Sequence, residues 1–233
     1  MAKSLKYVFP STGHCGSRYV ASLMTDAGIV CGHERVFNGD RLSLHYIDND
    51  MLVAESSAFA PPFLAHPVCD GATIIQIVRH PLNVLRSWLY SEGAWGPRAH
   101  PAFVAGLEQH PELWKSKLPL WRQSMAKNPD WLATFYLAWN DLIQKLAPGC
   151  RVFRIEDGPK LLDYVETEGT TDFDDRSHNS HSVRKEPLTW DVVRRKEVRE
   201  RLLERCFQYG YTENPDEAIP KDYQLRRGQR ADS

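Results

Sequence analysis

The chain has 233 residues, of which 42% are hydrophobic, and this is enough to bury the core of one sizeable domain. Lys and Arg number 29 against 30 Asp and Glu, so the net charge of −1 predicts no general attraction to nucleic acid or to an anionic membrane. Any anion-binding site must therefore be local. We expect a single domain over 1–233, with an irregular insertion at 91–127 and a tail, 214–233, that is disordered or forms an edge extension.

The cysteines are odd in number and scattered, without the paired spacing that binds zinc or marks a disulfide framework. They are Cys15, Cys31, Cys69, Cys150 and Cys206. The first ten residues lack the apolar core of a signal peptide, and no stretch is long enough to span a membrane. We therefore expect a cytoplasmic protein that binds no metal.

The first predicted unit is a strand, a loop and a helix. An apolar run over 7–9 ends at Pro10, and the loop that follows contains Gly13 and Gly16. Apolar residues then recur at helical spacing, at Val20, Leu23, Met24 and Ala27. Such a loop can present backbone N–H groups and the positive end of the helix to phosphate or sulfate.

A second strand is predicted over 29–31, followed by polar residues at 32–35. In an open α/β sheet, ligands bind beyond the carboxyl ends of the strands, so these residues are candidates for a site. Residues 36–70 have weak periodicity and several prolines. We predict mostly loop there, with short helical pieces.

The clearest strand covers 73–78, whose β-branched and apolar residues are typical of a central parallel strand. Arg79 follows at once, and Pro81 is well placed to start a helix with an apolar stripe over 84–89. This is a second junction between a strand and a helix, and it carries a charged residue.

The remaining elements continue the alternation of strands and helices. Asn128 and Pro129 open a long helix with a core-facing stripe, and a strand follows over 151–155, with a helical segment after it. Residues 167–187 are polar and are predicted to form a loop, after which Thr189 caps a final helix that ends near Gly210. The alternation predicts an α/β three-layer sandwich with a mostly parallel sheet.

The first loop lacks the Gly-Lys-Ser/Thr ending of nucleotide triphosphatases, which disfavours ATP or GTP hydrolysis. It resembles the 5′-phosphosulfate loop of sulfotransferases, in particular a Gly-His-Ser-Gly-Thr variant with Cys in place of Ser and Ser in place of Thr. The candidate binding residues of this loop are Gly13, His14, Cys15, Gly16, Ser17 and Arg18.

The second junction, IIQIVRHPLNVLRSWL, strengthens the resemblance. In sulfotransferases a strand ends in Arg, a turn containing Pro follows, and a Ser lies eight positions after the Arg. Both residues bind the 3′-phosphate of 3′-phosphoadenosine 5′-phosphosulfate (PAPS), and Arg79 and Ser87 match them in order and spacing. The resemblance implies the P-loop, nucleotide-kinase-like fold of that family.

Two shorter segments are also similar to sulfotransferases. Residues 31–35, CGHER, resemble a segment of tyrosylprotein sulfotransferases that carries the catalytic base, which would be Glu34 here, with His33 as its rival. Residues 179–190, NSHSVRKEPLTW, resemble a late segment of Golgi carbohydrate sulfotransferases whose basic residues close over the nucleotide. Arg184 and Lys185 would take that role.

The resemblance implies in-line transfer of a sulfuryl group from PAPS to an acceptor hydroxyl, on a sugar, a tyrosine or a small molecule, without a metal ion. The bisphosphate product is 3′-phosphoadenosine 5′-phosphate (PAP). Backbone N–H groups of 16–18 would hold the 5′-phosphate, and protonated His14 or Arg18 would neutralise charge on the bridging oxygen. Two alternatives stay open: a kinase-like phosphotransferase that needs ATP and magnesium, and a non-catalytic nucleotide-binding module.

Overall fold

The computed structural model describes residues 3–90, 99–113, 128–166 and 187–217. Its centre is a five-stranded sheet in which every neighbouring pair of strands is parallel. In spatial order the strands are β2 (Cys31–His33), β5 (Ala54–Ser57), β1 (Tyr7–Pro10), β6 (Thr73–Val78) and β7 (Arg151–Arg154). The predicted α/β class and parallel sheet are confirmed.

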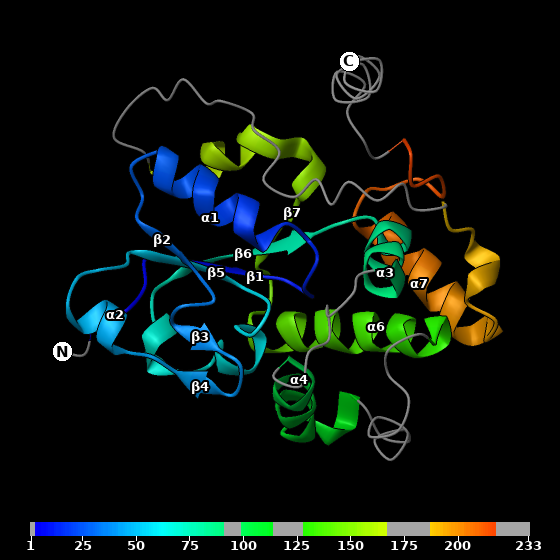
Figure 1. Ribbon diagram of the computed structural model, residues 1–233, viewed down its shortest axis with the longest axis horizontal. Helices are drawn as coiled ribbons and strands as arrows, with labels where there is room; N and C mark the ends of the chain where they lie inside the picture. Colours follow the sequence, from blue (N-terminus) through cyan, green and yellow to red (C-terminus); the bar gives the residue numbers. More distant parts are fainter. Residues whose placement is uncertain (1–2, 91–98, 114–127, 167–186, 218–233) are drawn as a thin grey trace.

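Helices cover both faces of this sheet and complete a three-layer arrangement (Figure 1). Helix α1 lies against one face, and the long helix α6 lies against the other, where α3, α4 and α7 pack around it. These helices are α1 (Ser17–Asp26), α3 (Pro81–Tyr90), α4 (Ala99–Glu108), α6 (Pro129–Leu146) and α7 (Lys196–Gln208). Asn128 caps α6 by accepting a hydrogen bond from the Trp131 N–H, as its position before Pro129 suggests.

Strand β5 lies within residues 36–70, where we predicted mostly loop with short helical pieces and no strand. That prediction was wrong for Ala54–Ser57, a segment of one alanine, one glutamate and two serines that is buried along its whole length. It pairs with β1 on one side and β2 on the other. Its polar composition hid a central strand. The same region also holds a small hairpin, β3 (Phe37–Asn38) with β4 (Arg41–Leu42), and the short helix α2 (His45–Asp48).

Three other boundaries differ from the prediction. Strand β2 occupies 31–33 instead of 29–31, so His33 is its last residue. The segment after β7 is η5 (Ile155–Tyr164), a 3-10 helix interrupted at Gly158, where φ is 54°. Thr189 precedes the short 3-10 helix η6 (Trp190–Val192), and α7 begins only at Lys196.

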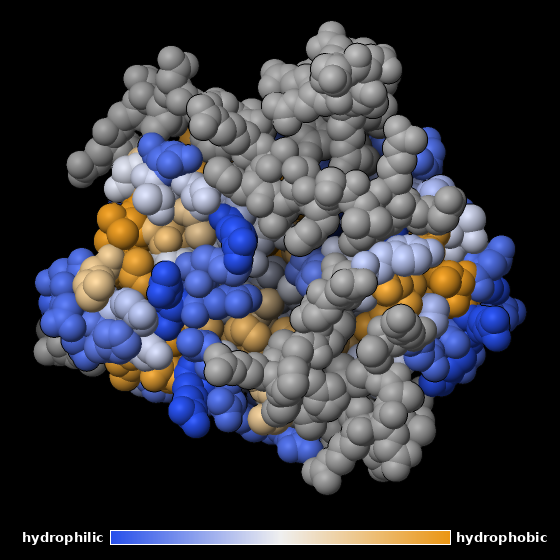
Figure 2. Space-filling model, in the orientation of Figure 1, coloured by the Kyte–Doolittle hydropathy of each residue, from blue (hydrophilic) through white to orange (hydrophobic). Residues whose placement is uncertain are grey.

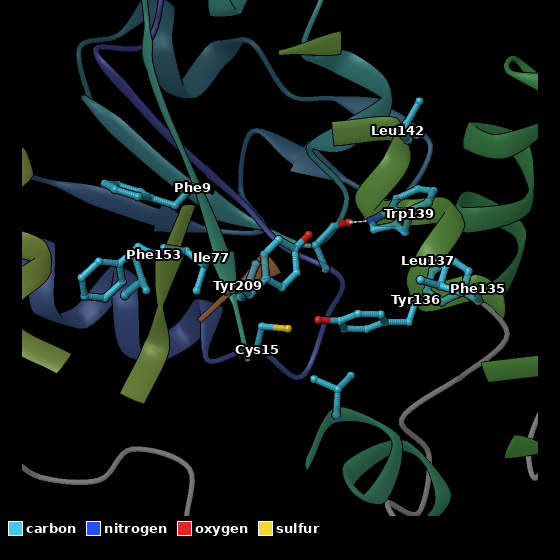
Figure 3. Packing of buried hydrophobic residues seen from close by; sticks show 14 of the residues in the cluster. Phe9, Cys15, Ile77, Phe135, Tyr136, Leu137, Trp139, Leu142, Phe153 and Tyr209 are labelled. Carbon is cyan, nitrogen blue, oxygen red and sulfur yellow. Dashed lines mark hydrogen bonds between the residues drawn. The ribbon is translucent and has the colours of Figure 1, made fainter. Parts of the chain in front are cut away.

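Helix α6 holds the carboxyl edge of the sheet in place as well as filling the core. The Trp139 Nε1–H donates to the carbonyl oxygens of Ser11, at 3.2 Å, and Ala58, at 3.1 Å, which follow β1 and β5. Figure 3 shows Trp139 and Tyr136 on this helix, among the buried residues of the core. The Tyr136 hydroxyl donates to the Arg79 carbonyl oxygen at 3.2 Å. One helix therefore fixes the exits of three neighbouring strands.

On the face shown in Figure 2, the described residues form a patchwork in which hydrophilic side chains separate smaller hydrophobic areas. Among all the residues that the structure describes, no helix is both long enough and apolar enough to cross a membrane.

Candidate active site

Strands β1 and β6 are neighbours whose connections leave in opposite directions. From β1 the chain passes through α1 to β2 at one edge of the sheet, whereas from β6 it passes through α3 and α6 to β7 at the other edge. The carboxyl end of such a strand pair is where open α/β sheets bind ligands. Both predicted phosphate-binding turns begin there, the first after Pro10 and the second at Arg79.

The first turn bends through three residues with positive φ: Gly13 at 78°, His14 at 53° and Gly16 at 87°. A Cβ on Gly16 would lie 2.6 Å from Cγ1 of Ile155, so this position needs glycine for space as well as for conformation. Gly16 is the N-cap of α1, and no side chain caps the helix. The first N–H groups of α1 have no partner inside the helix and can bind an anion.

Cys15 turns inward from this loop. It is fully buried, its sulfur lies 3.1 Å from the Thr12 hydroxyl, and burial raises the pKa of its thiol to about 11. The thiol is therefore neutral at physiological pH. Cys15, a candidate binding residue, contributes its backbone at this turn while its side chain packs in the core.

The two turns contact each other directly through His14. Its Nδ1 lies 2.7 Å from the Ser87 hydroxyl on α3. The Arg79 guanidinium donates to the His14 carbonyl oxygen at 3.2 Å. Arg79, Ser87 and the first loop, which the sequence relates only by resemblance, thus form one connected group.

Strand β2 brings His33 to the first turn from the other side of β1. Its Nε2 lies 3.0 Å from the Ser17 hydroxyl at the start of α1. Burial lowers the pKa of His33 to about 4, with further lowering by the Arg18 and Arg35 guanidinium groups, so the ring is neutral at physiological pH. Among the described residues, the hydrogen-bond partner of this ring is the Ser17 hydroxyl, and no carboxylate bonds to it.

Glu34 follows β2 in the left-handed region, with φ at 56°, a conformation that costs free energy for any residue with a side chain. Its N–H donates to the Ser56 carbonyl oxygen at 3.4 Å. Burial raises the pKa of the Glu34 carboxyl, while the nearby Arg18 guanidinium lowers it. A half-buried carboxylate with increased proton affinity suits a general base.

Two further carboxyl groups lie beside the predicted site residues but were not among them, one fully buried and one half-buried. Glu55 on β5 has no exposed surface, and burial raises its pKa to about 8. Glu156 lies beyond β7, where its carboxylate accepts hydrogen bonds from the Tyr211 hydroxyl at 2.5 Å and the His80 N–H at 3.5 Å. Burial raises the pKa of Glu156, and the Tyr211 hydrogen bond and the Arg79 guanidinium lower it. Glu156 directly follows the strand predicted over 151–155, whereas Glu55 lies inside a strand whose polar residues gave no sequence signal.

The structure therefore brings together residues 13–18, 33–34, 79 and 87 at the carboxyl end of the parallel strands. Arg184 and Lys185 lie outside the described residues. Within the described ranges, no three His, Cys, Asp or Glu side chains are grouped so that they could hold a metal ion.

Comparisons of this chain with protein-family models, with curated proteins and with solved structures found no match. The function is therefore inferred from the geometry at the carboxyl end of the strands and from the chemistry of the side chains there.

Proposed function

We propose that the protein is a sulfotransferase that transfers the sulfuryl group of PAPS to a hydroxyl acceptor. The observation that supports this most strongly is the contact of the two turns at His14. The turn after β1 offers uncapped helix N–H groups, and the turn after β6 offers a guanidinium and a hydroxyl. Two adjoining anion sites of this kind suit a nucleotide that carries phosphate groups at both its 3′ and 5′ positions.

The residues present suit the donor. Backbone N–H groups of Gly16, Ser17 and Arg18 would bind its 5′-phosphate, because Gly16 brings no side chain between them and the ligand. Arg79 and Ser87 would bind the 3′-phosphate, since a guanidinium forms strong charge-assisted hydrogen bonds with phosphate. The absence of a lysine at the end of the loop disfavours a nucleoside triphosphate.

In the proposed reaction the acceptor oxygen attacks sulfur as the bond from sulfur to the phosphate oxygen breaks. The acceptor proton passes to Glu34, whose burial increases its affinity for a proton. PAP leaves, and Arg18 or His14 stabilises the charge on its phosphate. His33 remains the rival base, because its neutral ring can also accept a proton beside Ser17.

The acceptor class is a hydroxyl compound: a sugar, a tyrosine side chain or a small molecule. Nucleic acid is not expected as a partner, given the balanced net charge of −1. The described cysteines are free thiols, which suits a reducing compartment such as the cytoplasm.

Calorimetric titration with PAP tests the donor site. We expect binding by the unaltered protein and a loss of about 10- to 100-fold in affinity for Arg79→Ala, the effect of removing a charge-assisted hydrogen bond. Arg151→Ala is the matched control, because Arg151 lies at the opposite end of the sheet, over the Tyr164 ring. Absence of PAP binding, or equal weakening by both variants, would refute the proposal.

Melting temperatures measured with PAP and with ATP and magnesium distinguish the sulfotransferase from the kinase-like phosphotransferase. The donor geometry predicts that PAP raises the melting temperature of the protein and that ATP with magnesium raises it less. The reverse order would favour a kinase-like enzyme on the same fold.

A further inference from the structure

Glu55 lies at the centre of a group of contacts that the proposed reaction does not use. It is fully buried on β5, between β1 and β2, and its side chain extends over Gly32 on β2. A Cβ on Gly32 would lie 2.0 Å from the Glu55 Oε2, so only glycine at that position leaves room for the carboxyl group. Strand β2 thus accommodates a carboxyl group that reaches past its end.

The Glu55 carboxyl binds the turn that carries Glu34. Its Oε1 accepts hydrogen bonds from the Arg35 N–H, at 2.6 Å, and the Val36 N–H, at 3.2 Å. Two residues further along β5, the Ser57 hydroxyl donates to the Phe37 carbonyl oxygen at 3.2 Å. Side chains of β5 therefore hold the backbone on the C-terminal side of Glu34.

This support coincides with strain. Glu34 has a φ of 56°, and a residue other than glycine keeps such a conformation only where its surroundings impose it. Glu55 also has a cost of its own, because its Oε2 is buried without a hydrogen-bond partner among the described residues. A strained turn and an incompletely satisfied carboxyl that binds it are typical of a functional site more than of a stabilising one.

We infer that Glu55 is a positioning residue: it fixes the strained 34–36 turn so that the Glu34 carboxylate stands at the site near Arg18. The inference builds on the proposed function, because Glu34 is the general base only in that proposal. The hydrogen bonds to the turn can, however, be tested without any donor or acceptor.

Amide hydrogen exchange of the unaltered protein is the first measurement. The Arg35 and Val36 amides should exchange slowly, as hydrogen-bonded groups, and Glu55→Leu, which removes the acceptor at similar volume, should speed their exchange by about tenfold or more. Glu55→Gln keeps one acceptor oxygen and should restore slow exchange. Fast exchange in the unaltered protein would overturn the inference, even if the Leu variant did not fold.

Kinetics is the second measurement, with PAPS and the acceptor that supports turnover in a panel of sugars, tyrosine peptides and small phenols. Glu55→Leu should lower kcat by about 10- to 100-fold and leave KM and PAP affinity near their original values, because a small displacement of a catalytic group affects the chemical step. Glu55→Gln should retain most of kcat. A Leu variant with unchanged kcat would overturn the inference. Protected amides in a protein that does not bind PAP would refute the proposed function and leave the Glu55 contacts established.

Discussion

The two sides of strand β1 differ in how fully their polar groups are satisfied. On the β6 side, Arg79, Ser87 and Glu156 all have hydrogen-bond partners. On the β5 side, Glu34 has a strained backbone, and the Glu55 Oε2 and the Ser56 hydroxyl are buried without partners in the described part of the chain. The β6 side is therefore the more completely hydrogen-bonded of the two, and under the proposed function it would bind the donor while the β5 side would hold the base.

The substitution Glu34→Gln should have the largest effect, and it should act on turnover alone. It removes the proposed base and keeps the size of the side chain, so kcat should fall by about 10²- to 10⁴-fold. PAP affinity should stay the same, because the proposed donor contacts lie on α1 and on the β6 side. Single-turnover kinetics and calorimetry would measure the two quantities. Unchanged turnover would show that Glu34 is not the base and favour His33, whereas the absence of turnover in the unaltered protein would favour a non-catalytic nucleotide-binding module.

The substitution Gly16→Ala should destabilise the turn after β1, which lies between the β5 side and the β6 side. An L-residue in the left-handed region costs about 1–2 kcal/mol, and crowding against Ile155 adds about 1–3 kcal/mol. The free energy of unfolding, measured in denaturant, should therefore fall by about 2–5 kcal/mol.

Gly28→Ala is a matched control for this loss. Gly28 has a similar φ of 85°, but nothing lies within 4 Å of a Cβ placed there. It should cost only the conformational part, about 1–2 kcal/mol. Equal losses for both variants would show that Ile155 yields to the added methyl group.

The features that the sequence predicts well are those built from local signals. The run over 73–78, followed by Arg79 and Pro81, combines β-branched residues with a helix start, and both strand-to-helix turns are found where they were predicted. The segment over 54–57 contains no such pattern, because a glutamate and two serines are buried in a central strand. Its stability as a strand comes from pairing with β1 and β2, which a local pattern does not contain.

The same distinction applies to the site. Arg79 lies in the turn directly after β6 and Ser87 lies on α3, which follows that turn, so their spacing along one continuous segment relates them. The contact of Ser17 with His33 and the binding of the 34–36 turn by Glu55 depend on how α1, β2 and β5 come together. Glu55 binds backbone N–H groups, which every sequence has, and so no residue pattern marks its partners.

Measuring the free energy of unfolding at several pH values should isolate the contribution of the Glu55 carboxyl. Burial raises its pKa from 4.5 to about 8, so the native protein keeps a proton there that the unfolded chain loses above pH 4.5. The free energy of unfolding should therefore fall as the pH rises from about 4.5 to about 8, by at most about 1.4 kcal/mol per pH unit. Glu55→Gln cannot titrate and should lack this fall, although the nearby Glu34 still titrates.

The difference in unfolding free energy between Glu55→Gln and the unaltered protein should thus grow in favour of the variant across this pH range. Denaturant titrations at pH 5, 6, 7 and 8, about one pH unit apart, would measure it. A difference that is constant with pH would show that Glu55 is ionised in the native protein.

The smallest expected effect is that of Ser87→Ala, which tests the contact between the two turns. Deleting the hydroxyl removes its hydrogen bond to His14 and one proposed contact with the 3′-phosphate. A hydrogen bond contributes about 0.5–1.5 kcal/mol, so PAP affinity should fall by about 2- to 12-fold. Thr134→Ala deletes a comparable helix hydroxyl, bound to the Asp130 carbonyl oxygen on α6, and should leave affinity unchanged. If Ser87→Ala binds PAP as tightly as the unaltered protein, the hydroxyl serves only to hold His14, and Arg79 alone supplies the side-chain contact on the β6 side.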